Sequence, residues 1–331
     1  MTTKEKKEKI LISGVKPTGR PHIGNYFGAM KRFVDLQDDY RAMIFIADYH
    51  ALTTERDAKK LRDGSLDIAI DYLAIGLDPK KTIIFKQSDV PEVTELAWIF
   101  NCLTTMPFLL RAHAYKDALA KNKEVNVGIF DYPILMAADI LIQDADVVPV
   151  GQDQKQHVEI ARDTVEKFNL TYGETFKLPE PRIDESVATI PGVDGKKMSK
   201  SYGNTISLFA TDEEIEKQVM SIVTDSNGVD EPKDPSKDTV FAMHRLFSAS
   251  SLKEIESRYR KGGIGYKESK EILIASIERF IAPLREKRSE LASDTDYVLD
   301  VLKEGGQRAR EKALKKMEDV REVIGVKLYS N

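Results

Sequence analysis

The sequence predicts an α/β fold in which a doubly wound, parallel, Rossmann-like sheet is followed by an all-helical C-terminal domain. Short apolar runs without polar alternation recur in the first half of the chain, as expected of strands covered on both faces. Helical periodicity separates these runs, which favours parallel strands with right-handed crossovers. After residue 207 no strand signal of comparable quality follows, and helical patterns continue.

The elements of the predicted sheet follow one another at short spacing. The apolar runs that we expect to form strands are Ile10–Ile12, Ala42–Ala47, Thr82–Phe85 and Asp146–Val148. The helical patterns start near Ile23 and then cover Lys59–Ile75, Tyr132–Ile142 and Asp153–Phe168. Residues 91–128 are mostly helical and interrupt the alternation, so we interpret them as an insertion between two halves of the sheet. These elements define a first domain over residues 1–206.

The second predicted domain, residues 207–331, is helical. Thr211–Glu214 and Ser251–Glu254 have the pattern of a capping box, which opens a helix. Residues 266–292 predict a long helix that is kinked at Pro283. The basic helical segment Gln307–Lys316 could contact RNA phosphates or pack back on the first domain, and we favour packing.

Composition narrows the classes of function. The 331 residues carry a net charge of −4, so a nucleic-acid partner would need a local basic surface. The single cysteine, Cys102, allows neither an internal disulfide nor a cysteine-ligated cluster, which suits a reducing compartment. The N-terminus is charged rather than signal-like, and no apolar run is long enough to cross a bilayer. We therefore expect a cytoplasmic protein without a membrane partner.

Two segments have the residue types that hold a triphosphate. Thr18–Asn25 lies between the first strand and the first helix, where open parallel sheets bind ligands and helix N–H groups attract anions. In it, Gly24 permits close approach to the backbone and His22 can donate to phosphate. Lys197–Ser201 reads Lys-Met-Ser-Lys-Ser in a glycine-rich loop that could close over the β- and γ-phosphates. Each segment alone also fits an ordinary surface turn, but together they favour a nucleotide site.

In this order the two segments resemble the signatures of the class I aminoacyl-tRNA synthetases, except that Asn25 replaces the second histidine of the first signature. The resemblance implies that His22, Lys197, Ser199 and Lys200 are catalytic. It implies Mg²⁺ bound to the ATP phosphates, with no metal held by the protein. The implied ATP-binding residues are Lys16, Thr18, His22, Gly24, Asn25, Gly151, Asp153, Lys197, Met198, Ser199, Lys200 and Ser201.

The middle of the chain resembles the bacterial tryptophanyl-tRNA synthetases. Tyr132–Ile140 and Val147–His157 carry this resemblance, which extends over nearly the whole chain. It implies a pocket in which the Asp139 carboxylate accepts the N–H group of an indole. The other implied pocket residues are Gly14, His50, Tyr132, Met136, Val148, Val150 and Gln154.

The spacing of the pocket residues agrees with that chemistry. Tyr132, Met136 and Asp139 fall on one helix face, because they are separated by four and three residues. An apolar surface with one acceptor suits the indole ring, whose nitrogen only donates. Without the resemblance, Asp139 would be interpreted as an exposed or salt-bridged residue. His50 could line the pocket or cap a neighbouring turn.

The resemblance implies a two-step reaction. L-Tryptophan and ATP form tryptophanyl-adenylate and pyrophosphate, and the tryptophan is then transferred to the 3′ end of tRNA(Trp). It also implies a homodimer with residues 91–128 near the interface, and anticodon binding by residues 207–331. Cys102 alone cannot ligate the iron–sulfur cluster of some relatives. The alternatives are a tyrosyl-tRNA synthetase, an adenylating enzyme that does not use tRNA, and a catalytically silent paralogue.

Overall fold

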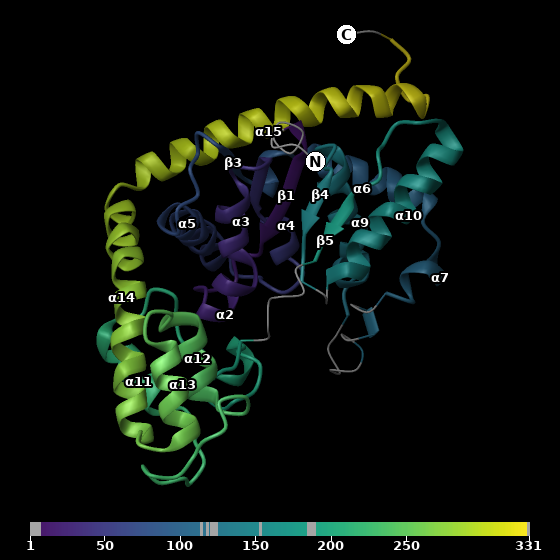
Figure 1. Ribbon diagram of the computed structural model, residues 1–331. Helices are drawn as coiled ribbons and strands as arrows, with labels where there is room; N and C mark the ends of the chain where they lie inside the picture. Colours follow the sequence, from purple (N-terminus) through teal and green to yellow (C-terminus); the bar gives the residue numbers. More distant parts are fainter. Residues whose placement is uncertain are drawn as a thin grey trace. The chain divides into compact units, whose positions relative to one another are not determined.

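The apolar runs form a five-stranded parallel sheet in the computed structural model, which describes residues 8–112, 115–116, 119, 125–151, 154–183 and 190–329 (Figure 1). The strands are β1 (Ile10–Val15), β2 (Arg41–Ile46), β3 (Thr82–Lys86), β4 (Val147–Pro149) and β5 (Glu180–Arg182). Their order is β3-β2-β1-β4-β5, and every pair is parallel. The predicted fold class is therefore confirmed.

Strand β5 is absent from the sequence-based prediction. It is only three residues long and reads Glu-Pro-Arg, with no apolar residue other than proline. A proline cannot donate to a neighbouring strand, which restricts it to positions such as this sheet edge. The strand forms because Glu180 and its neighbours pair with β4, a contact that the local sequence does not reveal.

The chain divides into two units. The sheet unit comprises the described residues within Met1–Gly19, Arg32–Asp184 and Asp294–Asn331, and the helical unit comprises those within Arg20–Lys31 and Glu185–Ser293. This division differs from the predicted boundary at residue 206 in two ways. The loop Lys197–Ser201, called the lysine loop below, belongs to the helical unit, and the last helix, α15 (Thr295–Val323), belongs to the sheet unit.

Helices cover the sheet within the sheet unit. The sequence after β1 continues as α2 (Ile23–Asn25), a π-helical turn at Tyr26–Met30 and α3 (Lys31–Leu36). Of these, α2 and the π-helical turn belong to the helical unit, and α3 from Arg32 onward belongs to the sheet unit. The other described helical elements of the sheet unit are α4 (Asp48–Ala51), α5 (Ala58–Ala74), the 3₁₀ turn η2 (Gln87–Asp89), α6 (Glu92–Leu103), α7 (Met106–Leu109), α9 (Val127–Ile142), α10 (Lys155–Tyr172) and α15 (Thr295–Val323).

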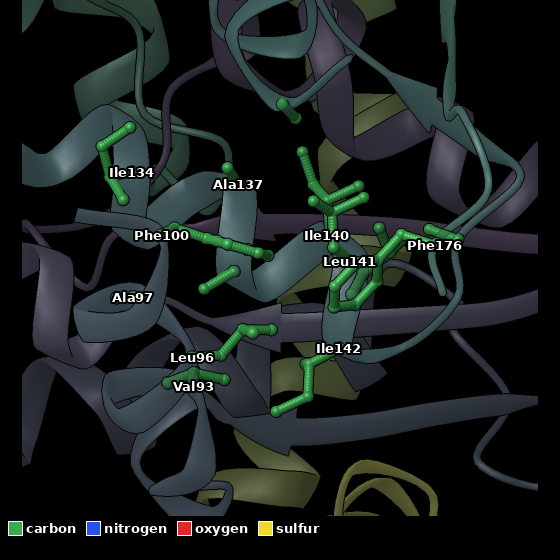
Figure 2. Close-up of a cluster of buried hydrophobic side chains, with 14 of the residues drawn as sticks. Val93, Leu96, Ala97, Phe100, Ile134, Ala137, Ile140, Leu141, Ile142 and Phe176 are labelled. Carbon is green, nitrogen blue, oxygen red and sulfur yellow. The ribbon is translucent and has the colours of Figure 1, made fainter. Parts of the chain in front are cut away.

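The main core of this unit lies where α6 meets α9. Figure 2 shows apolar side chains from both helices gathered together, with Phe176 joining them. Phe100 of α6 is fully buried, and its ring centre lies 5.5 Å from that of Phe176. This packing holds α9 in place, and α9 carries the predicted tryptophan-binding residues Tyr132, Met136 and Asp139.

Helix α15 packs closely against β3, which is an edge strand (Figure 1). A Cβ atom at Gly305 would collide with the carbonyl oxygen of Ile84, and one at Gly306 would lie 2.8 Å from the Cβ of Asp89. The two glycines therefore permit this approach, and the helix covers an edge that would otherwise be open to pairing. Arg310 also forms an ion pair with the buried Glu92 at 2.8 Å.

The helical unit has its own core. Its main helices are α11 (Asp212–Met220), α12 (Thr239–Phe247), α13 (Leu252–Lys261) and α14 (Tyr266–Ser293). Lys270 of α14 is buried and donates to the carbonyl oxygens of Met220 and Ile222 at 2.9 and 2.7 Å. This ammonium group ties the end of α11 and the turn that follows it to α14, because carbonyl groups at the C-terminus of a helix have no partner within the helix.

The two capping-box predictions have different outcomes. Thr211 and Glu214 cap each other's backbone N–H groups at the start of α11, at 3.2 and 2.9 Å, which confirms the first prediction. At the second, α13 does begin after Ser251, but the predicted capping bonds are wrong, since the Ser251 side chain makes no cap bond to the helix and instead donates to the carbonyl oxygen of Ser248. No helix among the described residues is long and apolar enough to span a membrane.

Candidate active site

His22–Asn25 of the first signature and Lys197–Ser201 of the second lie together in the helical unit. His22 forms an isolated antiparallel bridge with Ser207, and the N–H of Ile23 donates to the carbonyl oxygen of Ile206 at 3.0 Å. Met198, in the middle of Lys-Met-Ser-Lys-Ser, is buried in the same apolar cluster as Ile23. The two signatures therefore pack against each other, although they are 172 or more positions apart in the chain.

His22 and Asn25 cap one another. The Asn25 N–H donates to His22 Nδ1 at 3.2 Å, and the His22 N–H donates to Asn25 Oδ1 at 3.1 Å. This explains the departure from the family signature, since an amide oxygen can accept the bond that holds the turn. Because Nδ1 accepts, the neutral imidazole carries its proton on Nε2, which leaves a donor for a ligand.

The ring of His22 is neutral at physiological pH. Its pKa is lowered from 6.5 to about 4, chiefly by burial and then by the positive charge of Lys200. The position of this ring also explains why residue 24 is a glycine, because a Cβ there would lie 2.9 Å from His22 Nδ1 and 3.3 Å from the Cβ of Met198. Gly24 is thus required for packing between the two signatures.

The lysine loop is anchored by Asn204, a residue that the sequence analysis did not select. Its side-chain oxygen accepts the N–H of Ser199 at 2.8 Å, and its amide donates to the carbonyl of Lys197 at 3.1 Å. Lys197 and Lys200 remain exposed, while the hydroxyls of Ser199 and Ser201 lie 2.8 Å apart. The backbone of the loop is therefore held in place, while its two lysine side chains are exposed.

A second cluster of polar groups is buried in the sheet unit around Asp139. His50 Nε2 lies 2.9 Å from Asp139 Oδ2, and Gln87 Nε2 lies 2.9 Å from both carboxylate oxygens. His50 and Gln87 follow β2 and β3, so the cluster occupies the carboxyl edge of the sheet, where such folds bind ligands. The imidazole of His50 thus contacts Asp139 and does not merely cap a turn.

The Asp139 side chain is 4% exposed. Burial raises the pKa of its carboxyl group, and the hydrogen bonds from His50 and Gln87 counteract that rise. Gln87 is the most important residue that sequence reasoning missed. Its signal was available, because a polar residue directly after a buried strand faces the ligand edge of a parallel sheet.

Tyr132 and Gln154 are joined by another residue that was not selected, His157. The Tyr132 hydroxyl lies 3.0 Å from His157 Nε2, and His157 Nδ1 lies 2.8 Å from Gln154 Oε1. Lys16, predicted to bind ATP, has its ammonium 5.4 Å from the centre of the Tyr132 ring, and burial lowers its pKa. The structure therefore places Lys16 beside the predicted tryptophan residues of the sheet unit.

The remaining predicted residues lie in different surroundings. Val148 and Val150 are buried in the main core, and Met136 packs against it. A Cβ at Gly14 would lie 2.7 Å from the ring of Phe45, so this position needs glycine for packing. Thr18 and Gly151 are exposed on the sheet unit. Asp153 lies outside the described residues.

Comparison with known proteins assigns the chain to a family. Residues 4–282 match the family model described as tRNA synthetases class I (W and Y). The chain therefore belongs to the class I tRNA synthetases. Over 320 residues it is 51% identical to the tryptophan–tRNA ligase of Fusobacterium nucleatum, covering 96% of this chain and 98% of that protein. Within the class, it is a member of the bacterial tryptophan–tRNA ligases.

Other comparisons agree. The tryptophan–tRNA ligase of Rhodopirellula baltica is 48% identical, with 96% of this chain and 99% of that protein covered. The crystal structure of tryptophanyl-tRNA synthetase from Campylobacter jejuni complexed with ADP and tryptophan has a TM-score of 0.90 at 46% identity, covering 96% of this chain and 99% of that one. The resemblance inferred from the sequence is thus confirmed.

Proposed function

We propose that this chain activates L-tryptophan with ATP and transfers it to the 3′ end of tRNA(Trp). The observation that carries the proposal is the buried Asp139 carboxylate, held by His50 and Gln87 at the ligand edge of the sheet. A carboxylate in such a place is a strong acceptor for an indole N–H. Phenylalanine would leave one acceptor position of this carboxylate unfilled, and sites of this kind reject such analogues by about 10⁴-fold or more.

The rest of the tryptophan pocket is assigned by the same chemistry. Met136, Val148 and Val150 would pack the indole, and Gly14 and His50 would border it. Tyr132 and Gln154 would bind the α-ammonium group, and their link through His157 supports this because it fixes both side chains. A tyrosine-specific enzyme would instead need polar partners for a phenolic hydroxyl.

The helical unit carries the catalytic groups proposed to act on the ATP phosphates, namely His22, Lys197, Ser199 and Lys200. Lys197 and Lys200 would neutralise the charge that develops on pyrophosphate, and Ser199 would add a hydrogen bond. His22 would donate from Nε2 as a neutral group, which its low pKa supports. The remaining proposed ATP contacts are Lys16, Thr18, Gly24, Asn25, Gly151, Asp153, Met198 and Ser201.

We propose that Mg²⁺ enters with the ATP phosphates, where it would neutralise their charge. Among the described residues, no group of three or more His, Cys, Asp and Glu side chains that could hold a metal ion is found. The proposed ATP-binding residues carry ammonium, amide and imidazole N–H groups, which donate hydrogen bonds to phosphate oxygens and do not bind a cation.

We further propose a cytoplasmic homodimer whose interface includes α6 and α7. Trp98, Met106 and Val127, which all lie within residues 91–128, are 70%, 61% and 79% exposed, and exposed large apolar side chains are suited to a protein partner. The helices of residues 207–293 are proposed to receive the anticodon.

Aminoacylation tests the proposed function. Purified protein should attach labelled tryptophan to a tRNA(Trp) transcript, and neither tryptophan to tRNA(Tyr) nor tyrosine to either transcript. Charging of tRNA(Tyr) with tyrosine would replace the proposal with its nearest alternative. Formation of adenylate without transfer to any tRNA would favour an adenylating enzyme of another kind.

A further inference from the structure

The side chain of Gln87 has a fixed orientation. It is 1% exposed and stands directly after β3, as the first residue of η2. Its oxygen accepts the backbone N–H of His50 at 3.2 Å. Because a backbone N–H can only donate, the oxygen of the amide must face His50 and its NH₂ group must face Asp139.

The two oxygens of Asp139 consequently differ. Oδ2 lies 2.9 Å from both His50 Nε2 and Gln87 Nε2, whereas Oδ1 lies 2.9 Å from Gln87 Nε2 only, among the described residues. Each carboxylate oxygen can accept about two hydrogen bonds. Oδ2 is therefore filled, and Oδ1 retains a free acceptor position.

The turn that carries Gln87 is held from both sides. The N–H of Ser88 donates to Asp48 Oδ1 at 2.9 Å, and the Ser88 hydroxyl also contacts the Asp48 carboxylate. Asp89 accepts the N–H of Lys86 at 3.0 Å and lies against Gly306 of α15. The Gln87 backbone thus cannot move toward or away from Asp139 without breaking these contacts.

We propose that Gln87 is a positioning residue that determines specificity, because it turns the Asp139 carboxylate so that Oδ1 accepts the indole N–H. This inference rests on the proposed function, since it concerns the same pocket. A neutral donor is suited to the task. It donates to both oxygens without adding a positive charge, so the carboxylate keeps the negative charge that makes Oδ1 a strong acceptor for the indole N–H.

The test compares tryptophan with 3-benzothienylalanine, in which sulfur replaces the indole N–H and the ring shape is retained. ATP–pyrophosphate exchange gives kcat/KM for each, and their ratio measures the N–H contact alone. We expect the parent to prefer tryptophan by about 10²-fold or more, as for a bond to a charged acceptor. Gln87→Met should lower that ratio at least tenfold, with the KM for ATP unchanged.

Gln143→Met is the matched control. Gln143 is also 1% exposed and lies at the end of α9, but its amide donates to the carbonyl of Ala309 at 3.1 Å and not to Asp139. This variant should lower the melting temperature and keep the parent ratio. Should Gln87→Met fail to fold, Gln87→Asn retains an amide that is one methylene too short to reach the carboxylate.

The outcomes separate the two proposals. An unchanged ratio in Gln87→Met, or an equal fall in Gln143→Met, would overturn the role of Gln87 while leaving tryptophan activation intact. Absence of tryptophan-dependent exchange in the parent would instead overturn the proposed function itself.

Discussion

Acid should destabilise the helical unit through His244. This histidine is fully buried in α12, where Nδ1 lies 2.8 Å from the Ser248 hydroxyl and Nε2 lies 3.0 Å from that of Ser269. Burial lowers its pKa from 6.5 to about 4. The unfolded chain therefore binds a proton between these two values that the folded chain does not bind.

The size of the effect follows from linkage. The stabilising contribution of a neutral His244 is fully present above pH 6.5 and is lost as the pH falls toward 4. Because one pKa unit corresponds to about 1.4 kcal/mol, the loss is about 3 kcal/mol at pH 4. His22 has a similarly lowered pKa and adds its own loss. A His244→Gln variant isolates the contribution of His244, because His22 is present in both the parent and the variant.

Urea unfolding followed by far-ultraviolet circular dichroism at pH 7 and pH 4 measures this difference. The variant should be less stable than the parent at pH 7, having lost buried hydrogen bonds. Between pH 7 and pH 4, however, the parent should lose about 3 kcal/mol more than the variant. Parallel losses in the two proteins would refute the reasoning, because His244 would then titrate alike in the folded and unfolded chains.

The remaining predictions concern packing and catalysis. Gly305→Ala should lower the free energy of unfolding by about 1–3 kcal/mol in urea titrations, because the added methyl group meets the carbonyl of Ile84. Gly28→Ala is the control and should not lower it, because the space around Gly28 is open. Equal effects of the two substitutions would contradict the packing of α15 on β3. Lys200→Ala should slow adenylate formation about 10²- to 10³-fold in single-turnover assays and leave tryptophan binding unchanged, with the neighbouring exposed Lys196→Ala as control. For His22→Gln, the ratio of parent to variant exchange rates should stay constant from pH 6 to 8, because the parent imidazole is already neutral there; a step near pH 6.5 would show that His22 ionises.

Local pattern was sufficient for the framework of the fold. The continuous apolar runs at Ile10–Ile12, Ala42–Ala47 and Thr82–Phe85 all became strands, because residues buried on both faces leave a signal that does not depend on their partners. Strand β5 left none, since Glu-Pro-Arg is stabilised by pairing with β4. Ser251 shows the converse, where a capping pattern is present but the side chain takes another acceptor.

The sequence was sufficient to select residues for the candidate site, but it did not predict the hydrogen bonds between them. The Asp139 environment joins residues 52 and 89 positions apart in the chain, and no periodicity connects them. Family resemblance selected Asp139 and His50, but it did not indicate Gln87 or His157. These two side chains form hydrogen bonds with the selected residues. Such supporting contacts are long-range hydrogen bonds, and they become visible only once the strands have fixed which chain segments are neighbours.

The central claim is that Asp139 selects tryptophan for activation by ATP. ATP–pyrophosphate exchange without tRNA, run with each of the twenty amino acids on the parent and on Asp139→Ala, tests it most directly. We expect tryptophan alone to stimulate exchange in the parent, and a loss of that preference by orders of magnitude in the variant with ATP binding intact. Stimulation of the parent by tyrosine, or an unchanged preference in Asp139→Ala, would contradict the account.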